Sequence, residues 1–124
     1  MAKTVIGIDW GTTNRRAYVL DGEGKLARCH SDHSGILAVD GDFENSLRQL
    51  LQTLDSASGE VIMSGMVGSR NGWQQVPYLD VQQPVDRLKQ AMVEIPTAIE
   101  GVRCRIVPGM KFVDSHGVPD VMRG

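Results

Sequence analysis

The sequence predicts an α/β fold in which a mixed sheet of about five strands is flanked by helices. Two observations support this fold class. Short apolar runs rich in β-branched residues recur along the chain, and two of the stretches between them repeat apolar residues at the period of a helix. The predicted elements follow one another in the order β-β-β-α-β-α-β, and the 124 residues fit one domain.

The first three strands are predicted to form an antiparallel meander. Residues 4–9 are an apolar run with β-branched members, which is typical of a buried strand. Residues 11–13 are turn-like, and residues 15–20 return to strand character. The Asp-Gly-Glu-Gly stretch at 21–24 is a strong turn signal, and residues 25–30 are its partner strand.

A single apolar stripe predicts the first helix. Its members recur at helical spacing and are Phe43, Leu47, Leu50, Leu51 and Leu54. Asp42 is placed to cap the N-terminus of this helix. Residues 60–63 are the fourth predicted strand, and they lead into an irregular, polar and glycine-rich stretch over 64–80.

The second helix is predicted to begin at Pro84, because proline is favoured at the first position of a helix. The apolar face of this helix consists of Val85, Leu88, Met92 and Ile95. Residues 105–107 are the last predicted strand, and the tail over 109–124 shows little periodicity.

Composition excludes several classes of protein. A net charge of −2 leaves no electrostatic footprint for nucleic acid or for an anionic membrane. No apolar run approaches the roughly 20 residues of a membrane helix, and the N-terminus lacks a secretory pattern. Two cysteines, Cys29 and Cys104, are too few for a disulfide framework. We therefore expect a cytoplasmic protein with neither nucleic acid nor membrane as a partner.

The most informative motif is Gly-Ile-Asp-Trp-Gly-Thr-Thr-Asn-Arg at residues 7–15. Gly11 lets the backbone approach an anion closely, and the amides of the turn can point at phosphate oxygens. Thr12 and Thr13 add hydroxyl donors, and Asp9 can hold a hydrated Mg²⁺. The motif is neither a Walker A loop nor a dinucleotide fingerprint. It favours polyphosphate binding, and the alternative is a plain β-turn that contains an aspartate.

Residues 8–14, followed by an antiparallel meander, resemble the first phosphate segment of the actin, hexokinase and heat-shock chaperone ATPase superfamily. This resemblance implies a ribonuclease H-like lobe, of the kind that binds ATP between two related lobes. It also implies ATP and Mg²⁺ as cofactors.

Four further segments are similar to the 2-dehydro-3-deoxygalactonokinase family, and they lie at residues 64–73, 76–78, 107–110 and 119–124. The resemblance covers the whole chain but only the first part of the family's length. It implies that residues 1–124 are the N-terminal lobe of a two-lobe kinase, with the C-terminal lobe absent from this chain. The implied reaction is ATP-dependent phosphorylation of 2-dehydro-3-deoxy-D-galactonate to its 6-phosphate, in galactonate breakdown.

Such a substrate carries a carboxylate, which the planar fork of an arginine matches. Arg70 lies in a glycine-punctuated polar loop, where binding residues are often placed, and Ser69 and Asn71 could bind hydroxyls beside it. Trp73 could stack against the sugar or simply pack. The alternative for Arg70 is a solvated loop residue or a contact with the other lobe.

Arg15 and Arg16 begin the second predicted strand, so their side chains point to opposite faces of the sheet. One of them can face the cleft. We favour Arg15 because it is closer to the phosphate motif, although a surface position is equally open to both.

Phosphoryl transfer also needs a carboxylate that accepts the proton of the attacking hydroxyl. The resemblance to sugar kinases places this base near the end of the first lobe, where Asp120 lies in chain order. Asp80 and Asp114 are rivals, and the alternative role for Asp120 is capping of a helix or loop.

The cluster His30-Ser31-Asp32-His33 invites a metal-site interpretation, but it has no second group of ligands. We interpret it as a surface turn.

Three hypotheses remain open: a sugar-acid kinase lobe, a nucleotide-binding module used for switching or assembly, and a small α/β binding domain. The kinase is favoured because the phosphate motif and the segment at 64–73 occur together. An isolated lobe is expected to bind nucleotide weakly and to turn over nothing. It would also expose an apolar lobe interface through which the chain can self-associate.

Overall fold

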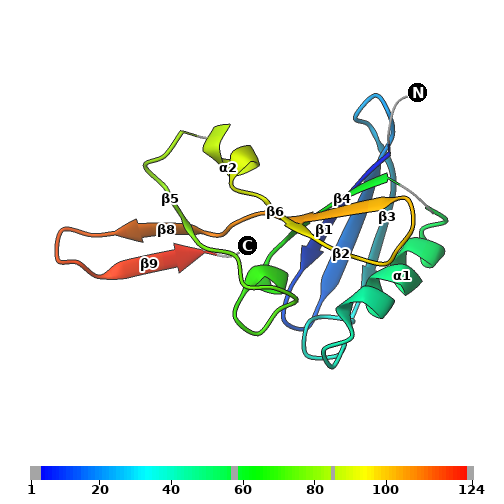
Figure 1. Cartoon of the computed structure of the whole chain (residues 1–124), viewed down its shortest axis with the longest axis horizontal. Coiled ribbons are helices and arrows are strands. Elements are labelled where there is room, and N and C mark those ends of the chain that lie inside the picture. Colours follow the sequence, from blue (N-terminus) through cyan, green and yellow to red (C-terminus); the bar gives the residue numbers. More distant parts are fainter. Residues whose placement is uncertain (1–3, 57–58, 85, 123–124) are drawn as a thin grey trace.

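Six strands form the main sheet, in the order β3-β2-β1-β4-β7-β6 (Figure 1). The computed structural model describes residues 4–56, 59–84 and 86–122. The strands of the main sheet are β1 (Val5–Trp10), β2 (Arg15–Leu20), β3 (Leu26–Asp32), β4 (Gly59–Ser64), β6 (Val93–Ile95) and β7 (Val102–Ile106). The first three pair antiparallel, β1, β4 and β7 pair parallel, and β6 runs antiparallel to β7. The predicted mixed α/β class is therefore confirmed.

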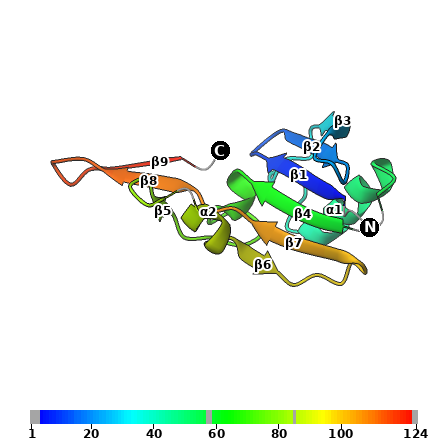
Figure 2. The same cartoon turned by 90° about the horizontal axis from the view of Figure 1, so that it is seen from above.

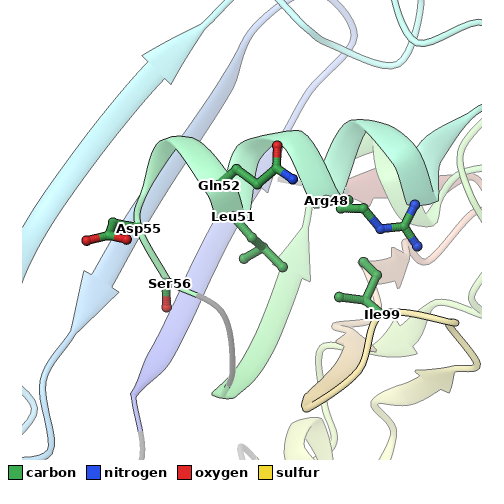
Figure 3. Close-up of a pocket in the computed structure, with 6 residues that line it drawn as sticks. All are labelled: Arg48, Leu51, Gln52, Asp55, Ser56 and Ile99. Carbon is green, nitrogen blue, oxygen red and sulfur yellow. The ribbon is translucent and has the colours of Figure 1, made fainter.

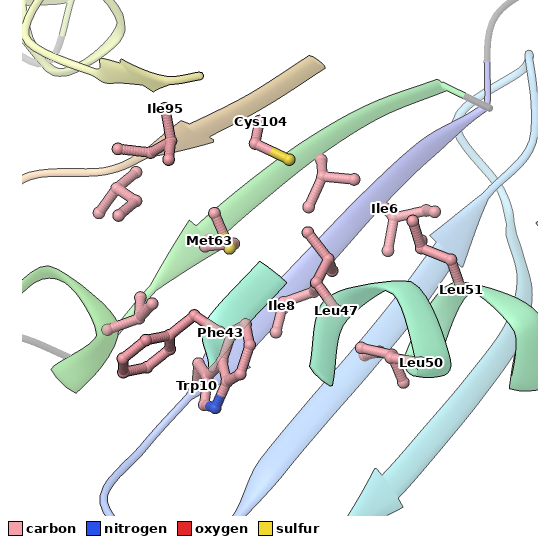
Figure 4. Close-up of a cluster of buried hydrophobic side chains, with 14 of the residues drawn as sticks. Ile6, Ile8, Trp10, Phe43, Leu47, Leu50, Leu51, Met63, Ile95 and Cys104 are labelled. Atoms are coloured by element: carbon pink, nitrogen blue, oxygen red, sulfur yellow. The ribbon is translucent and has the colours of Figure 1, made fainter. Parts of the chain in front are cut away.

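Helix α1 (Phe43–Thr53) covers one face of this sheet (Figure 1). All five members of the predicted apolar stripe are buried, and they meet the inward side chains of the sheet, among them Ile6, Ile8 and Trp10 of β1 (Figure 4). Burial of one such side chain stabilises the fold by about 1.5–3 kcal/mol. Asp42 occupies the N-cap position, but its side chain makes no capping hydrogen bond, which differs from the prediction.

The second predicted helix is wrong for most of its length. Helix α2 (Asp86–Gln90) has five residues, and the chain then enters β6 instead of continuing the helix. Ile95 is buried because β6 pairs with β7, where it lies opposite Cys104. The apolar spacing at 85–95 is a local pattern and predicted a helix, whereas the pairing of β6 with β7 depends on a segment farther along the chain. Val85 lies outside the described residues.

The tail forms a second sheet that the sequence did not predict. Its strands are β5 (Leu79–Asp80), β8 (Met110–Val113) and β9 (Pro119–Met122), in the order β5-β8-β9. Strands β8 and β9 form a hairpin that projects away from the main sheet (Figures 1 and 2). The last two residues, Arg123 and Gly124, lie outside the described part of the chain.

Two further observations concern the whole molecule. Cys29 and Cys104 are both free thiols, and of the two only Cys104 is buried. Among the described residues, the helices are all too short or too polar to cross a membrane.

Candidate functional site

Asp9 lies near the end of β1, on the face of the main sheet opposite α1. Its neighbours Ile8 and Trp10 are buried against the helix side, whereas Asp9 is exposed. Strand register places Arg16 of β2 and Ser64 of β4 on either side of Asp9. Residues in register on adjacent strands share one face. The open face of the sheet therefore carries a carboxylate flanked by a guanidinium and a hydroxyl.

A hollow of about 320 Å³ opens at this position. It is lined by Asp9, Gly11, Thr12, Thr13, Asn14 and Arg16. The fold thus brings together the four residues to which we assigned phosphate and metal binding. A second hollow, of about 510 Å³, shares Asn14 and Arg16 with the first, and its other lining residues are Arg15, Ser31, Asp32 and His33.

The backbone of the turn is held by a neighbouring segment. We call residues 11–14 the phosphate turn and residues 34–37 the strap. Within the strap, the amides of Gly35, Ile36 and Leu37 donate to the carbonyls of residues 13, 11 and 12, at 3.2, 2.9 and 3.2 Å. Three consecutive carbonyls of the turn therefore point toward the strap.

This arrangement determines where the amides of the phosphate turn point. No cis peptide bond occurs among the described residues, and across a trans peptide the carbonyl and the following N–H point in opposite directions. The amides of Thr12, Thr13 and Asn14 consequently point away from the strap. Successive amides that point to one side form a concave site for an anion.

The strap lies so close to the phosphate turn that its residue 35 must be a glycine. A Cβ atom on Gly35 would come within 2.4 Å of the Thr12 carbonyl oxygen. The next anchor is Trp10, whose Nε1 donates to the Ser34 carbonyl at 2.9 Å. Sequence analysis missed the strap, and the Ser-Gly dipeptide before an apolar pair was the only local signal for it.

Arg15 does not occupy the position that we expected for a substrate ligand. Strand alternation puts it on the α1 side, where it is 4% exposed. Its Nε and Nη2 donate to the Asp32 carboxylate at 3.2 and 2.8 Å, and its Nη1 donates to the Ser46 hydroxyl at 2.9 Å. The guanidinium also lies 4.9 Å from the centre of the Trp10 ring. Arg15 is thus engaged by side chains of the fold itself, and Arg16 is the arginine beside Asp9.

The segment interpreted as a surface turn is instead the end of β3, because Asp32 is the last residue of that strand. Its carboxylate also accepts from the Ser34 amide at 3.0 Å and contacts His30 Nε2 at 3.1 Å. Burial raises the pKa of Asp32. The hydrogen bonds and charge of Arg15, together with the hydrogen bonds of Ser34 and His30, lower it by more than burial raises it, so the pKa lies below its usual value. No cluster of three or more His, Cys, Asp or Glu side chains suited to a metal occurs in the described residues.

The glycine-rich loop begins against Asp9. Gly65 has a φ of 94°, and a Cβ atom there would lie 3.1 Å from the Asp9 carboxylate and 2.9 Å from the Trp10 carbonyl oxygen. The short helix η1 (Met66–Gly68) follows. Ser69 is buried and its hydroxyl donates to the Met66 carbonyl at 2.6 Å, so this side chain holds the loop.

The rest of the loop divides into exposed and packed residues. Arg70 and Asn71 are exposed, and neither makes an ion pair or a side-chain hydrogen bond with the described residues. Trp73 stacks on Phe43 with ring centres 6.0 Å apart and meets Trp10 edge-on at 6.3 Å. The aromatic ring of Trp73 therefore packs the loop onto the core.

Asp120 lies in β9, outside the hollow that contains Asp9. It lines a separate hollow of about 350 Å³ with Val81, Met110, Phe112, Val121 and Met122. Its two rivals are engaged in turns: Asp114 accepts from the amides of residues 116 and 118, and Asp80 accepts from the amide of residue 82.

One further hollow, of about 410 Å³, lies near the C-terminal end of α1 (Figure 3). It is lined by Arg48, Leu51, Gln52, Asp55, Ser56 and Ile99, and it contains none of the predicted site residues.

A family model described as 2-keto-3-deoxy-galactonokinase matches residues 9–124, which include Asp9, the phosphate turn and the glycine-rich loop. The chain belongs to this family. Membership in the 2-keto-3-deoxy-galactonokinase family agrees with the similarity found in the sequence and makes the hollow beside Asp9 a candidate kinase site.

Individual relatives support the same assignment. The chain is 31% identical to the 2-dehydro-3-deoxygalactonokinase of Escherichia coli (strain K12), over 100% of this chain and 40% of the relative. It is 29% identical to a Rhizobium meliloti (strain 1021) protein named "Probable 2-dehydro-3-deoxygalactonokinase DgoK1", over 94% of this chain and 38% of that protein.

A solved structure shows that the likeness extends to the fold. The crystal structure of "a putative 2-dehydro-3-deoxygalactonokinase protein from Sinorhizobium meliloti" superimposes with a TM-score of 0.86 and 26% identity. The superposition covers 97% of this chain and 39% of the chain in that crystal structure. The chain therefore spans about 40% of the length of the relatives that it matches.

Proposed function

We propose that this chain is the N-terminal lobe of a 2-dehydro-3-deoxygalactonokinase. The kinase transfers the γ-phosphoryl group of ATP to the terminal hydroxyl of 2-dehydro-3-deoxy-D-galactonate and forms the 6-phosphate, in the cytoplasm, as a step of galactonate breakdown. The observation that carries this proposal is the hollow that is lined by Asp9 and by the whole phosphate turn, whose carbonyls at residues 11–13 are bonded to the strap on its other side.

The topology supports a ribonuclease H-like lobe of the actin and hexokinase superfamily. Three antiparallel strands are followed by α1. After α1, β4 pairs parallel with β1, and β7 pairs parallel with β4. In such kinases a second lobe completes the nucleotide site. The greater length of the relatives is consistent with a C-terminal lobe of this kind.

The residues of the hollow fit a magnesium–polyphosphate complex. Mg²⁺ prefers oxygen ligands and keeps several waters, and Asp9 offers an exposed carboxylate with room for a hydrated ion. When bound, the ion would neutralise charge on the phosphate oxygens. The amides of Thr12, Thr13 and Asn14 would hold these oxygens, and Arg16 would contact them from β2.

The substrate residues follow from the same arrangement. Arg70 and Asn71 are free to bind the sugar acid from a loop that starts beside Asp9, whereas Ser69 and Trp73 would shape that loop from within. We keep Asp120 as the base that accepts the proton of the attacking hydroxyl. Unlike Asp80 and Asp114, its carboxylate makes no hydrogen bond with the described residues.

A nucleotide-binding module without kinase activity is the second candidate, because it would use the same hollow. It would not need an exposed arginine in the loop at 64–73. Phosphoryl transfer to an acid separates the two candidates, since both would bind the nucleotide.

The decisive experiment replaces the matching segment of the Escherichia coli relative with this chain and measures transfer of radiolabelled phosphate from ATP to a panel of 2-keto-3-deoxy acids. Activity with the galactonate-derived acid, lost in the matched Asp9→Asn chimera, would establish the kinase role. A folded chimera that binds ATP and phosphorylates no acid would favour the nucleotide module.

A further inference from the structure

On the strap side, the backbone of the phosphate turn is held by the three hydrogen bonds described above, and the side chain of Asn14 contacts His33 Nδ1 at 3.0 Å, directly before the strap. The geometry of the turn therefore depends on where the strap lies. The strap begins directly after β3, and Asp32 is the last residue of that strand. What holds Asp32 consequently determines the position from which the strap reaches the turn.

The Asp32 carboxylate is held by Arg15, by the Ser34 amide and by His30, whose Nε2 lies 3.1 Å from Oδ2. One side of the carboxylate receives the Arg15 guanidinium through two hydrogen bonds, and the side chain of Arg15 is only 5% exposed. The oxygen that accepts from Arg15 Nε also accepts from the Ser34 amide at 3.0 Å. A single carboxylate thus ties the first residue of the strap to a buried residue of β2.

The same residues also connect to the first strand. Ser34 receives the Trp10 indole N–H on its carbonyl, and Trp10 in turn packs against the Arg15 guanidinium. Both backbone groups of Ser34 are therefore bonded to side chains. From this fixed point the next three amides reach the three carbonyls of the turn.

We propose that Asp32 is a positioning residue for the phosphate site: through Ser34 it sets the strap, and the strap aims the amides of Thr12, Thr13 and Asn14 at the phosphate. The proposal rests on the proposed function, because it takes the hollow beside Asp9 as a phosphate site. Asp32 is not among the residues that line the hollow beside Asp9. Its effect on that hollow is transmitted through the backbone of the strap.

The test uses the 124-residue chain, labelled with ¹⁵N and titrated with magnesium pyrophosphate, while amide chemical shifts are followed. In the wild-type chain the largest shifts are expected at the amides of Thr12, Thr13 and Asn14. Asp32→Asn keeps the side-chain shape but replaces one oxygen that accepts from Arg15. We expect it to raise the dissociation constant about tenfold, the effect of one good hydrogen bond.

Two other variants complete the design. Gly35→Ala leaves Asp32 and Arg15 in place but forces the strap away from the Thr12 carbonyl, so it should weaken binding at least as much. Glu94→Gln is the control, because it removes a carboxylate from a different arginine ion pair. Glu94 pairs with Arg103 across β6 and β7, away from the phosphate turn, so this variant should leave pyrophosphate binding unchanged.

The outcomes separate the two proposals. A merely structural role for Asp32 would lower the melting temperature of Asp32→Asn without changing the dissociation constant of the folded chain, and that result overturns the positioning role alone. If the wild-type chain shows no shifts with pyrophosphate, the hollow beside Asp9 is not a phosphate site in this chain and the positioning role falls, whereas the kinase proposal is decided by the chimera. If Asp32→Asn does not fold, Arg15→Lys replaces it in the test, because lysine keeps the positive charge but cannot donate both hydrogen bonds to Asp32. Unchanged affinity of Arg15→Lys for pyrophosphate also overturns the positioning role of Asp32.

Discussion

Gly65 lies so close to Asp9 that a Cβ atom at its position would stand 3.1 Å from the carboxylate oxygen. The end of β4 and the end of β1 are adjacent in the sheet, with Asp9 in register with Ser64. The glycine-rich loop and the phosphate turn therefore meet at a single carboxylate. The absence of a side chain at Gly65 gives that carboxylate its space.

Replacement of Gly65 by alanine is expected to disturb the proposed magnesium site as well as the fold. The φ of 94° is unfavourable for alanine, and the Trp10 carbonyl would lie only 2.9 Å from the new Cβ. We expect a loss of about 1–3 kcal/mol in the free energy of unfolding and weaker binding of magnesium pyrophosphate. Denaturant unfolding and the ¹⁵N titration measure the two effects.

Gly24→Ala is the matched control for that variant. Gly24 has a φ of 80°, but nothing lies within 4 Å of its Cβ position. It should lose stability through backbone strain alone and bind pyrophosphate normally. Equal binding by both variants would show that Gly65 does not shape the site around Asp9.

Asp9→Asn is expected to remove magnesium dependence with little cost in stability. The Asp9 side chain is exposed and none of the described residues forms an ion pair with it. Pyrophosphate binding to the variant should be the same with and without Mg²⁺, and phosphoryl transfer by the chimera should fall about 100-fold or more. If magnesium still strengthens binding to the variant by the wild-type factor, the ion is held elsewhere.

The ion pair of Asp32 predicts a pH dependence of stability. The pKa of Asp32 in the folded chain lies below its usual value of 3.8, so the carboxylate stabilises the fold at pH values above about 4. This contribution is lost as the pH falls through the folded-state pKa. Asp32→Asn should therefore be less stable than the wild type by about 1–3 kcal/mol at pH 7, with the difference shrinking below pH 4. A constant difference from pH 7 to pH 2.5 would contradict the assignment.

The two cysteines are predicted to differ in reactivity. Burial raises the pKa of the Cys104 thiol from 9.0 to about 11, with the charge of Glu44 adding to the effect and a hydrogen bond to Thr97 opposing it. Cys29 is exposed on β3. An aromatic disulfide reagent at pH 8 should modify one thiol rapidly, and Cys29→Ser should abolish that phase. Rapid modification of two thiols in the folded chain would show that Cys104 is accessible.

The same thiol affects stability in alkali. Because the folded-state pKa is raised, the buried neutral thiol stabilises the fold fully below pH 9, and this contribution disappears as the pH rises toward 11. Comparison of the wild-type chain with Cys104→Ala by denaturant unfolding at pH 8 and pH 10.5 measures the loss.

The hairpin of β8 and β9 is predicted to promote self-association of the isolated chain. Phe112 and Met122 line one hollow and are 43% and 63% exposed. Sedimentation velocity should show association that decreases when both are replaced by serine. Leu26→Ser is the control, because Leu26 is similarly exposed, at 58%, on β3 of the main sheet. A purely monomeric wild-type chain would refute the prediction.

Local patterns in the sequence determined most of the main sheet and its helix. The stripe from Phe43 to Leu54 predicts α1 because a 3.6-residue period is visible within a few turns. The β-branched runs and the turn at 21–24 predict the meander for the same reason, since each signal lies within adjacent residues. Asp9 and the phosphate turn could also be predicted from the sequence, because the end of one strand and the turn directly after it supply these residues.

Tertiary structure decided the features that depend on distant partners. Strand alternation places Arg15 and Arg16 on opposite faces, but only the packing of α1 determines which face is buried, and this packing removes Arg15 from the site. The strap acquires its role by hydrogen bonding to a turn about twenty residues away along the chain. Strands β5, β6, β8 and β9 are too short to show a period of their own, and they exist because other strands satisfy their backbone groups.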